Sequence, residues 1–276
     1  MKAIILSDLK AVILSKRFWI AVGLIVISSA FTSITTFLFE YDVPSGFLEI
    51  FIFATIGGVP MMNFLAPFIP AIVFGPLIVD NMQTDAGKKL WQKTGIKKSL
   101  AAHSVSSAIT GAGIFMVAHV IVMACCFVYD PTISEIEHIA SGIFAEVFSA
   151  SVPMYIVLFI LYVSFFGAVY AFFSMGIGLA TKSYSMAMVL PGIIYHASSA
   201  MWVFLDSPIL SWVNILLPGT SYGFESDYPA APILDKVAGF GCIILAAAVL
   251  VIAAYKRMKR TPGVFIDESA QKKKEI

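Results

Sequence analysis

Long stretches without a charged residue dominate this chain and restrict what it can fold into. Six of them are long enough to cross about 30 Å of hydrocarbon as helices. The sequence is 59% hydrophobic and 13% charged, whereas soluble domains are about 25% charged. A soluble protein could not keep so many continuous apolar stretches out of water. The sequence therefore predicts an all-α, polytopic membrane protein with six transmembrane helices, at residues 18–39, 60–79, 104–128, 152–180, 185–205 and 237–255.

Two apolar segments are too short or too interrupted to count as spans. Residues 51–59 are broken by Gly57 and Gly58, so this segment either lengthens the second helix or lies beside it as a separate piece. Residues 208–221 are apolar but too short to cross the bilayer. They fit a re-entrant segment or an interfacial loop with Trp212 at the headgroup level, and both interpretations stay open.

The first 17 residues have an amphipathic pattern. Ile5, Leu9 and Val12 recur at helical spacing, while Lys2 and Asp8 interrupt the apolar residues. This pattern predicts an interfacial helix over residues 1–17.

The basic residues predict the orientation of the chain. With six spans both termini lie on one side, and that side holds every Lys and Arg except Lys236. Because cytoplasmic loops are enriched in Lys and Arg, the N and C termini are predicted to be cytoplasmic, including a basic tail over residues 256–276. Topology accounts for these charges, so they do not indicate a nucleic-acid partner.

Residues 80–103 form the predicted cytoplasmic loop between the second and third spans. Thr84 or Asp85 can cap a short helix that ends near Gly95. In one interpretation the five lysines of this loop only set topology and Trp91 anchors in the headgroups. In the other, the short helix contacts a partner protein.

Two stretches resemble a known family. "MKAIILSDLKAVILSKRFW" at the start and "DNMQTDAGKKLWQKTGIKKSLAAHS" after the second span, followed by four more spans and a basic tail, resemble permease subunits of ABC type-2 exporters. Among these they are most similar to the short six-helix permeases tied to export of, or immunity to, amphipathic peptides. In that family the N-terminal helix is an interfacial elbow, and the first cytoplasmic loop carries a coupling helix that sits in a groove of a separate ATPase. The resemblance implies ATPase contacts, apolar or polar, at Asp85, Lys88, Lys89, Leu90, Trp91 and Lys93.

The resemblance also implies partners for this chain. No G-x-x-x-x-G-K-[ST] motif occurs, so no phosphate-binding loop of that kind is present. A permease of this kind would bind no cofactor itself and would not be an enzyme, and ATP and Mg²⁺ would be held by a cytoplasmic ABC ATPase subunit. It would also need a second permease copy or a paralogue, and homodimer and heterodimer stay open. The expected location is the bacterial plasma membrane, in contact with lipid.

Ionisable residues inside the bilayer often serve function, which makes His119 and His196 candidates for a transport pathway. Structural histidines that face the protein interior are the alternative, since no carboxylate lies at a matching depth. The three cysteines do not form a metal-binding pattern, so no metal site is predicted.

Prolines mark two deformable places. Pro191 and Gly192 interrupt the fifth span, where freed backbone groups need other partners. Pro67 and Pro70 lie in the second span, which leads into the loop 80–103. We expect hinges at these positions.

Two other function classes compete with an exporter. A secondary transporter would show internal repeats or paired mid-membrane charges, and neither is clear here. An intramembrane enzyme would need a convergent catalytic set; Ser174 and His196 lie on adjacent spans without a supporting motif. By resemblance, the expected cargo is amphipathic or apolar.

Overall fold

The computed structural model describes residues 1–39, 46–56, 64–133, 147, 150–205 and 233–260. The described part of the chain is helical and contains no strand, which confirms the predicted all-α class. The main helices are α1 (Lys2–Ile13), α2 (Lys16–Phe39), α3 (Phe47–Ile56), α5 (Ile69–Gln83), α6 (Asp85–Thr94), α7 (Ile96–Tyr129), α9 (Val152–Thr181), α10 (Tyr184–Leu205) and α11 (Ile233–Arg260).

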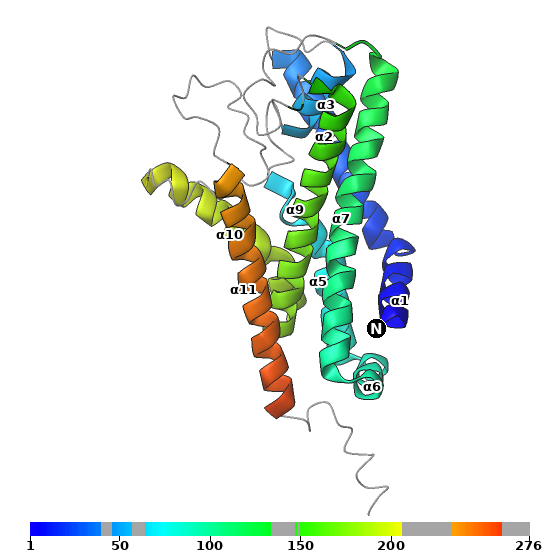
Figure 1. Cartoon of the computed structure of the whole chain (residues 1–276), viewed down its shortest axis with the longest axis vertical. Helices are drawn as coiled ribbons and strands as arrows, with labels where there is room; N and C mark the ends of the chain where they lie inside the picture. The colour runs from blue at the N-terminus through cyan, green and yellow to red at the C-terminus, as the bar shows by residue number, and fades with distance from the viewer. Residues whose placement is uncertain (40–45, 57–63, 134–146, 148–149, 206–232, 261–276) are drawn as a thin grey trace, which may run out of the picture.

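The helices form an elongated bundle around α9, which contacts α5, α7, α10 and α11. Figure 1 shows α7 and α9 running side by side along most of the molecule, while α10 leans away from the bundle. The N-terminus, α6 and the C-terminal end of α11 all lie at the lower end of this view. Segments far apart in sequence therefore share one end of the bundle.

Four helices of the described chain are long and apolar enough to cross a membrane. They are Lys16–Thr35, Ile96–Tyr129, Val152–Thr181 and Gly239–Arg260, and Ile69–Gln83 is a shorter apolar helix. This indicates a membrane protein. The predicted arrangement of six spans and cytoplasmic termini goes beyond this finding and stays a prediction.

The second predicted span differs most from the structure. The apolar residues before it form a separate helix, α3, and α5 begins only at Ile69. Pro67 lies in a turn and Pro70 in the first turn of α5. Since proline lacks the N–H that helix interiors require, it suits the start of a helix. At 15 residues, α5 is about 22 Å long, less than the hydrocarbon thickness.

Small residues bring the long helices close together. A Cβ atom on Gly111 of α7 would overlap the carbonyl oxygen of Gly167 in α9. On another side of α9, a Cβ on Gly176 would lie 3.2 Å from the carbonyl oxygen of Ala247 in α11. Such backbone approach is how membrane helices gain van der Waals contact.

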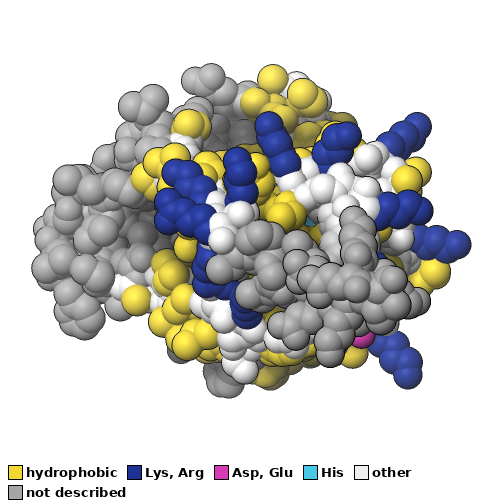
Figure 2. Space-filling view, turned by 90° about the horizontal axis from the view of Figure 1, so that it is seen from below, with side chains coloured by type: hydrophobic (Ala, Val, Ile, Leu, Met, Phe, Trp, Pro, Cys, Tyr) yellow, Lys and Arg dark blue, Asp and Glu magenta, His cyan; other side chains and the backbone are white. Residues whose placement is uncertain are grey.

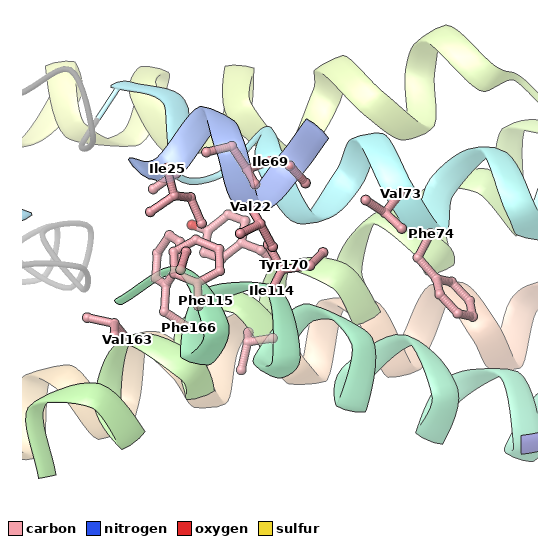
Figure 3. Close-up of a cluster of buried hydrophobic side chains, with 14 of the residues drawn as sticks. Val22, Ile25, Ile69, Val73, Phe74, Ile114, Phe115, Val163, Phe166 and Tyr170 are labelled. Carbon is pink, nitrogen blue, oxygen red and sulfur yellow. The ribbon is translucent and has the colours of Figure 1, made fainter. Parts of the chain in front are cut away.

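The core is a continuous apolar cluster between α2, α5, α7 and α9. In Figure 3, Val22 and Ile25 from α2 lie near Phe115 from α7 and Phe166 from α9. The rings of Phe115 and Phe166 are 5.8 Å apart, and Phe166 stacks on Tyr170 at 4.4 Å. Aromatic pairs therefore hold the centre of the bundle.

The N-terminal helix α1 packs along the chain's own α7. Ile4, Asp8 and Val12 form its buried face, and Leu6 and Ile13 are exposed. Its predicted interfacial position stays a prediction. The segment 208–221 and residues 261–276 of the predicted tail lie outside the described residues.

Candidate functional site

The helix α6 lies at the lower end of the bundle, between α5 and α7. The Thr84 hydroxyl accepts a hydrogen bond from the Gly87 amide at 3.3 Å, which caps its N-terminus. Gly95 ends it with φ of 82°, a conformation that favours glycine. The sequence predicted this helix and both of its ends. The predicted loop 80–103 is thus almost entirely helical.

The inward side of α6 is fixed by Trp91. This side chain is 2% exposed, and its ring stacks on that of His103 from α7 at 5.8 Å. Leu90 is half-buried against the core. In this structure Trp91 therefore packs within the chain and presents no surface to another protein. The ATPase contact expected at Trp91 stays a prediction.

The outward side of α6 carries only polar and charged residues among those whose side chains are described. Asp85, Lys89, Gln92 and Lys93 are exposed. Lys88 is half-buried, and its Nζ atom lies 3.8 Å from Asp85 Oδ1. The helix therefore separates an apolar inner side from a basic outer side.

Beneath Trp91, a buried hydrogen bond joins α1 to α7. The His103 Nδ1–H donates to Asp8 Oδ2 at 2.7 Å, with the histidine fully buried and the aspartate side chain 9% exposed. Because Trp91 stacks on the same imidazole, three helices meet at His103. The first 13 residues and α6 are thereby linked through one side chain.

This pair was not predicted from the sequence. One signal was present: Asp8 lies one turn from both Ile4 and Val12, on the apolar face of α1. A carboxylate on an apolar helical face needs a buried partner. The sequence offered no way to identify that partner as His103, which lies 95 positions away.

The carboxylate of Asp80 connects α5 to its neighbours at this end of the bundle. The Tyr184 hydroxyl of α10 donates to Asp80 Oδ1 at 2.5 Å, and Arg17 of α2 lies 3.9 Å from Asp80 Oδ2. The hydrogen bond to Asp80 is the main cause that raises the pKa of Tyr184 above its usual value of 10.0. Gln83 Nε2 also donates to the Lys182 carbonyl at 3.3 Å. The end of α5, one residue before α6, is therefore joined to α2 and α10.

Further along the bundle, α5 and α10 remain close together at two levels, one beside Ser174 of α9 and one at Gly192 of α10. The Ser174 hydroxyl of α9 donates to the Ala187 carbonyl at 2.7 Å, and a Cβ atom on Gly75 would meet both residues. A Cβ on Gly192 would overlap the ring of Phe68, just before α5. The two helices are thus in contact at several levels.

The predicted hinge residues occupy different settings. Pro191 and Gly192 lie inside α10 and are buried. Pro67 and Pro70 lie before α5 and in its first turn, so neither interrupts a helix. Movement at any of them stays a prediction.

The two candidate pathway histidines are not brought together. His119 is buried, and its Nδ1–H donates to the Phe115 carbonyl at 2.7 Å. His196 is half-buried, and its Nε2–H donates to the Phe64 carbonyl at 3.0 Å while its ring stacks on Phe64 and Phe68. The buried Nε2 atom of His119 has no hydrogen-bond partner among the described residues, and the role of both histidines in transport stays a prediction.

The lower end of the molecule is strongly basic. Figure 2 shows dark blue Lys and Arg side chains around this face, with little acidic surface visible. Two acids of this end, Asp8 and Asp80, are engaged as described. Within the described residues, no group of three or more His, Cys, Asp or Glu could hold a metal ion.

Comparison with protein-family models, with curated proteins and with solved structures finds no match for this chain. Its function is therefore inferred from its own residues and their geometry.

Proposed function

We propose that this chain is the transmembrane permease subunit of an ABC-type exporter. It moves an amphipathic or apolar substrate out of the cell, and a separate cytoplasmic ATPase subunit hydrolyses ATP with Mg²⁺. The resemblance of residues 1–19 and 80–104 to type-2 permeases supports this proposal. The position of α6 is the observation that carries it.

A short amphipathic helix at the tip of a bundle is suited to receive a force from outside the bundle. The inner side of α6 is held by Trp91, and its outer side is exposed and basic. Thr84 and Gly95 separate it from α5 and α7. A protein bound to its outer side could therefore move α5 and α7 together.

The contacts of α5 offer a route from α6 to the rest of the bundle. A displacement of α5 would reach α10 through the Asp80–Tyr184 hydrogen bond and the contacts around Ala187. In this proposal α10 bends at Pro191 and Gly192 and opens the substrate pathway. Coupling of this kind requires two distinct arrangements that the bound ATPase biases.

The topology belongs to the same proposal. Six spans, at residues 18–39, 60–79, 104–128, 152–180, 185–205 and 237–255, cross the bacterial plasma membrane with both termini in the cytoplasm. The basic lower end that carries α6 supports this orientation. α1 serves as the interfacial elbow, and a second permease copy or paralogue completes the pathway.

Measuring which energy source drives substrate efflux tests this proposal. Cells that express the chain at native level are loaded with a fluorescent amphipathic peptide, and its efflux is followed after ATP depletion or after collapse of the ion gradients. A strain without the chain is the control. We expect efflux that needs the chain and ATP and that continues without ion gradients.

Two results would contradict the proposal. Efflux that stops only when ion gradients collapse would favour a secondary transporter. Chemical conversion of the peptide by the purified chain alone would favour an intramembrane enzyme.

A further inference from the structure

Pro191 deprives one backbone carbonyl of α10 of its usual helical donor. In an α-helix each carbonyl accepts a hydrogen bond from the N–H four residues later, and proline has no N–H. The carbonyl of Ala187 therefore cannot receive this bond from Pro191. The helix nevertheless continues from Tyr184 to Leu205. A donor from outside the helical ladder is needed at this point.

Ser174 of α9 supplies that donor. Its hydroxyl donates to the Ala187 carbonyl at 2.7 Å. Both residues are 0% exposed, so solvent does not reach this hydrogen bond. The Ser174 hydroxyl thus stands in for the N–H that Pro191 lacks.

Helix α5 packs closely over this hydrogen bond. A Cβ atom on Gly75 of α5 would lie 2.6 Å from Ser174 Oγ and 3.0 Å from Ala187 Cβ. A Cβ atom on Gly178 of α9 would lie 3.4 Å from Ala187 Cβ. These two glycines leave the space in which Ser174 and Ala187 meet. The bond therefore lies at the junction of α5, α9 and α10.

The two parts of α10 on either side of Pro191 have different contacts. Before Pro191, the Tyr184 hydroxyl donates a hydrogen bond to α5. After Pro191, Tyr195 packs edge-on against Phe166 of α9 at 6.1 Å. Figure 1 shows α10 leaning away from the bundle. Since proline inside a helix permits a change of direction, a bond at this level can fix the angle between the two parts.

We propose that Ser174 is the positioning residue of α10: its hydroxyl completes the hydrogen bonding at Pro191 and so sets the direction of the part of α10 that follows. This concerns the shape of the chain and does not rest on the proposed function, although it names the residue that would control the bend described there. A serine hydroxyl can also bond the carbonyl four residues earlier in its own helix, which here belongs to Tyr170. Ser174 can therefore release α10 without losing a hydrogen bond of its own.

Distances between two spin labels test the proposal in the full chain, with the three native cysteines replaced by alanine. One label is attached at Val128→Cys, near the C-terminal end of α7, and the other at Ala197→Cys, after Pro191. A second pair combines the same α7 position with Met186→Cys, before Pro191. All three labelled positions are exposed.

Both distances are measured with and without Ser174→Ala, once with Pro191 present and once in a Pro191→Ala background. Ser164→Ala is the matched control, because this buried serine of α9 donates to the Ile160 carbonyl within its own helix. Size-exclusion profiles show whether each variant is folded.

We expect Ser174→Ala to shift or broaden the distance to position 197 by about 3 Å, which is what a change of about 20° at Pro191 gives over six residues of helix. The distance to position 186 should stay the same. The Pro191→Ala background should abolish the effect, because residue 191 then has an N–H that bonds the Ala187 carbonyl. Ser164→Ala should leave both distances unchanged.

Several results would overturn the proposal. One is an unchanged distance to position 197 in Ser174→Ala, and another is an equal shift with and without Pro191, since Ser174 would then act by packing alone. An equal shift at position 186 would mean that the whole helix moves. If Ser174→Ala does not fold, the Ser174→Ala, Pro191→Ala double variant decides: recovered folding supports the proposal, and failure to recover overturns it.

Discussion

His103 Nδ1 lies 2.7 Å from Asp8 Oδ2 in a buried position, although the two residues are 95 positions apart in the sequence. The hydrogen bond fastens α1 to α7, and the ring of Trp91 covers the same imidazole from α6. The helix that we propose to meet the ATPase is therefore supported by the N-terminus of the chain. Loss of this hydrogen bond should weaken the packing of both α1 and α6 against α7.

We expect Asp8→Ala to lower the free energy of unfolding by about 1–3 kcal/mol, because it leaves a buried donor without an acceptor. Thermal unfolding in detergent measures the effect. His103→Asn is the matched control, since its amide can still donate to Asp8, and it should lose less than His103→Leu. An Asp8→Ala protein as stable as the wild type would show that the bond does not fasten α1.

Trp91→Ala should destabilise the chain itself by about 3 kcal/mol or more, as expected for a large buried aromatic. Trp91→Phe should recover most of this loss because it keeps a ring against His103. Lys93→Ala, an exposed change on the same helix, should stay within about 0.5 kcal/mol of the wild type. If Trp91→Ala unfolded like the wild type but lost its partner, Trp91 would be an interface residue after all.

Gly111 and Gly113 offer a matched pair within α7. Gly111→Ala should cost about 1–3 kcal/mol, because its methyl group would overlap the Gly167 backbone and force α7 away from α9. Gly113 has nothing within 4 Å of its Cβ position, so Gly113→Ala should be neutral or slightly stabilising. Thermal unfolding of both variants gives the comparison. Equal effects would contradict the close crossing of the two helices.

The Tyr184–Asp80 bond predicts a pH dependence. Because its folded-state pKa is raised above 10.0, the Tyr184 contribution to stability is fully present below pH 10 and is lost as pH rises through the folded pKa. Wild type should therefore exceed Tyr184→Phe in stability at neutral pH, and the difference should shrink in alkali. Unfolding curves at several pH values measure it. A difference that grows with pH would contradict the bond.

The bounds of several helices can be predicted from the lengths of the apolar sequence segments. The predicted spans 152–180 and 185–205 lie close to α9 and α10, whose bounds are Val152–Thr181 and Tyr184–Leu205. Loss of apolar residues marks those ends clearly. The start of the second span could not be placed this way, because apolarity continues through Pro67 and Pro70 while the backbone does not stay helical.

The candidate site was predictable only where its signals were local. Thr84 and Gly95 have the chemistry of helix ends, so α6 could be placed from the sequence. The inward position of Trp91 could not, because the Trp91 ring packs on His103, which is itself bonded to Asp8 of α1, 95 positions away in the sequence. Contacts between distant segments require the packed structure.

Native mass spectrometry of the chain, released from its own membrane in mild detergent, tests whether the chain is a permease subunit that works with a separate ATPase. We expect a complex that contains two permease chains, this one paired with itself or with a paralogue, together with a polypeptide carrying a phosphate-binding loop. ATP hydrolysis should accompany that complex. A folded chain that leaves the membrane without any nucleotide-binding partner would rule out the permease proposal.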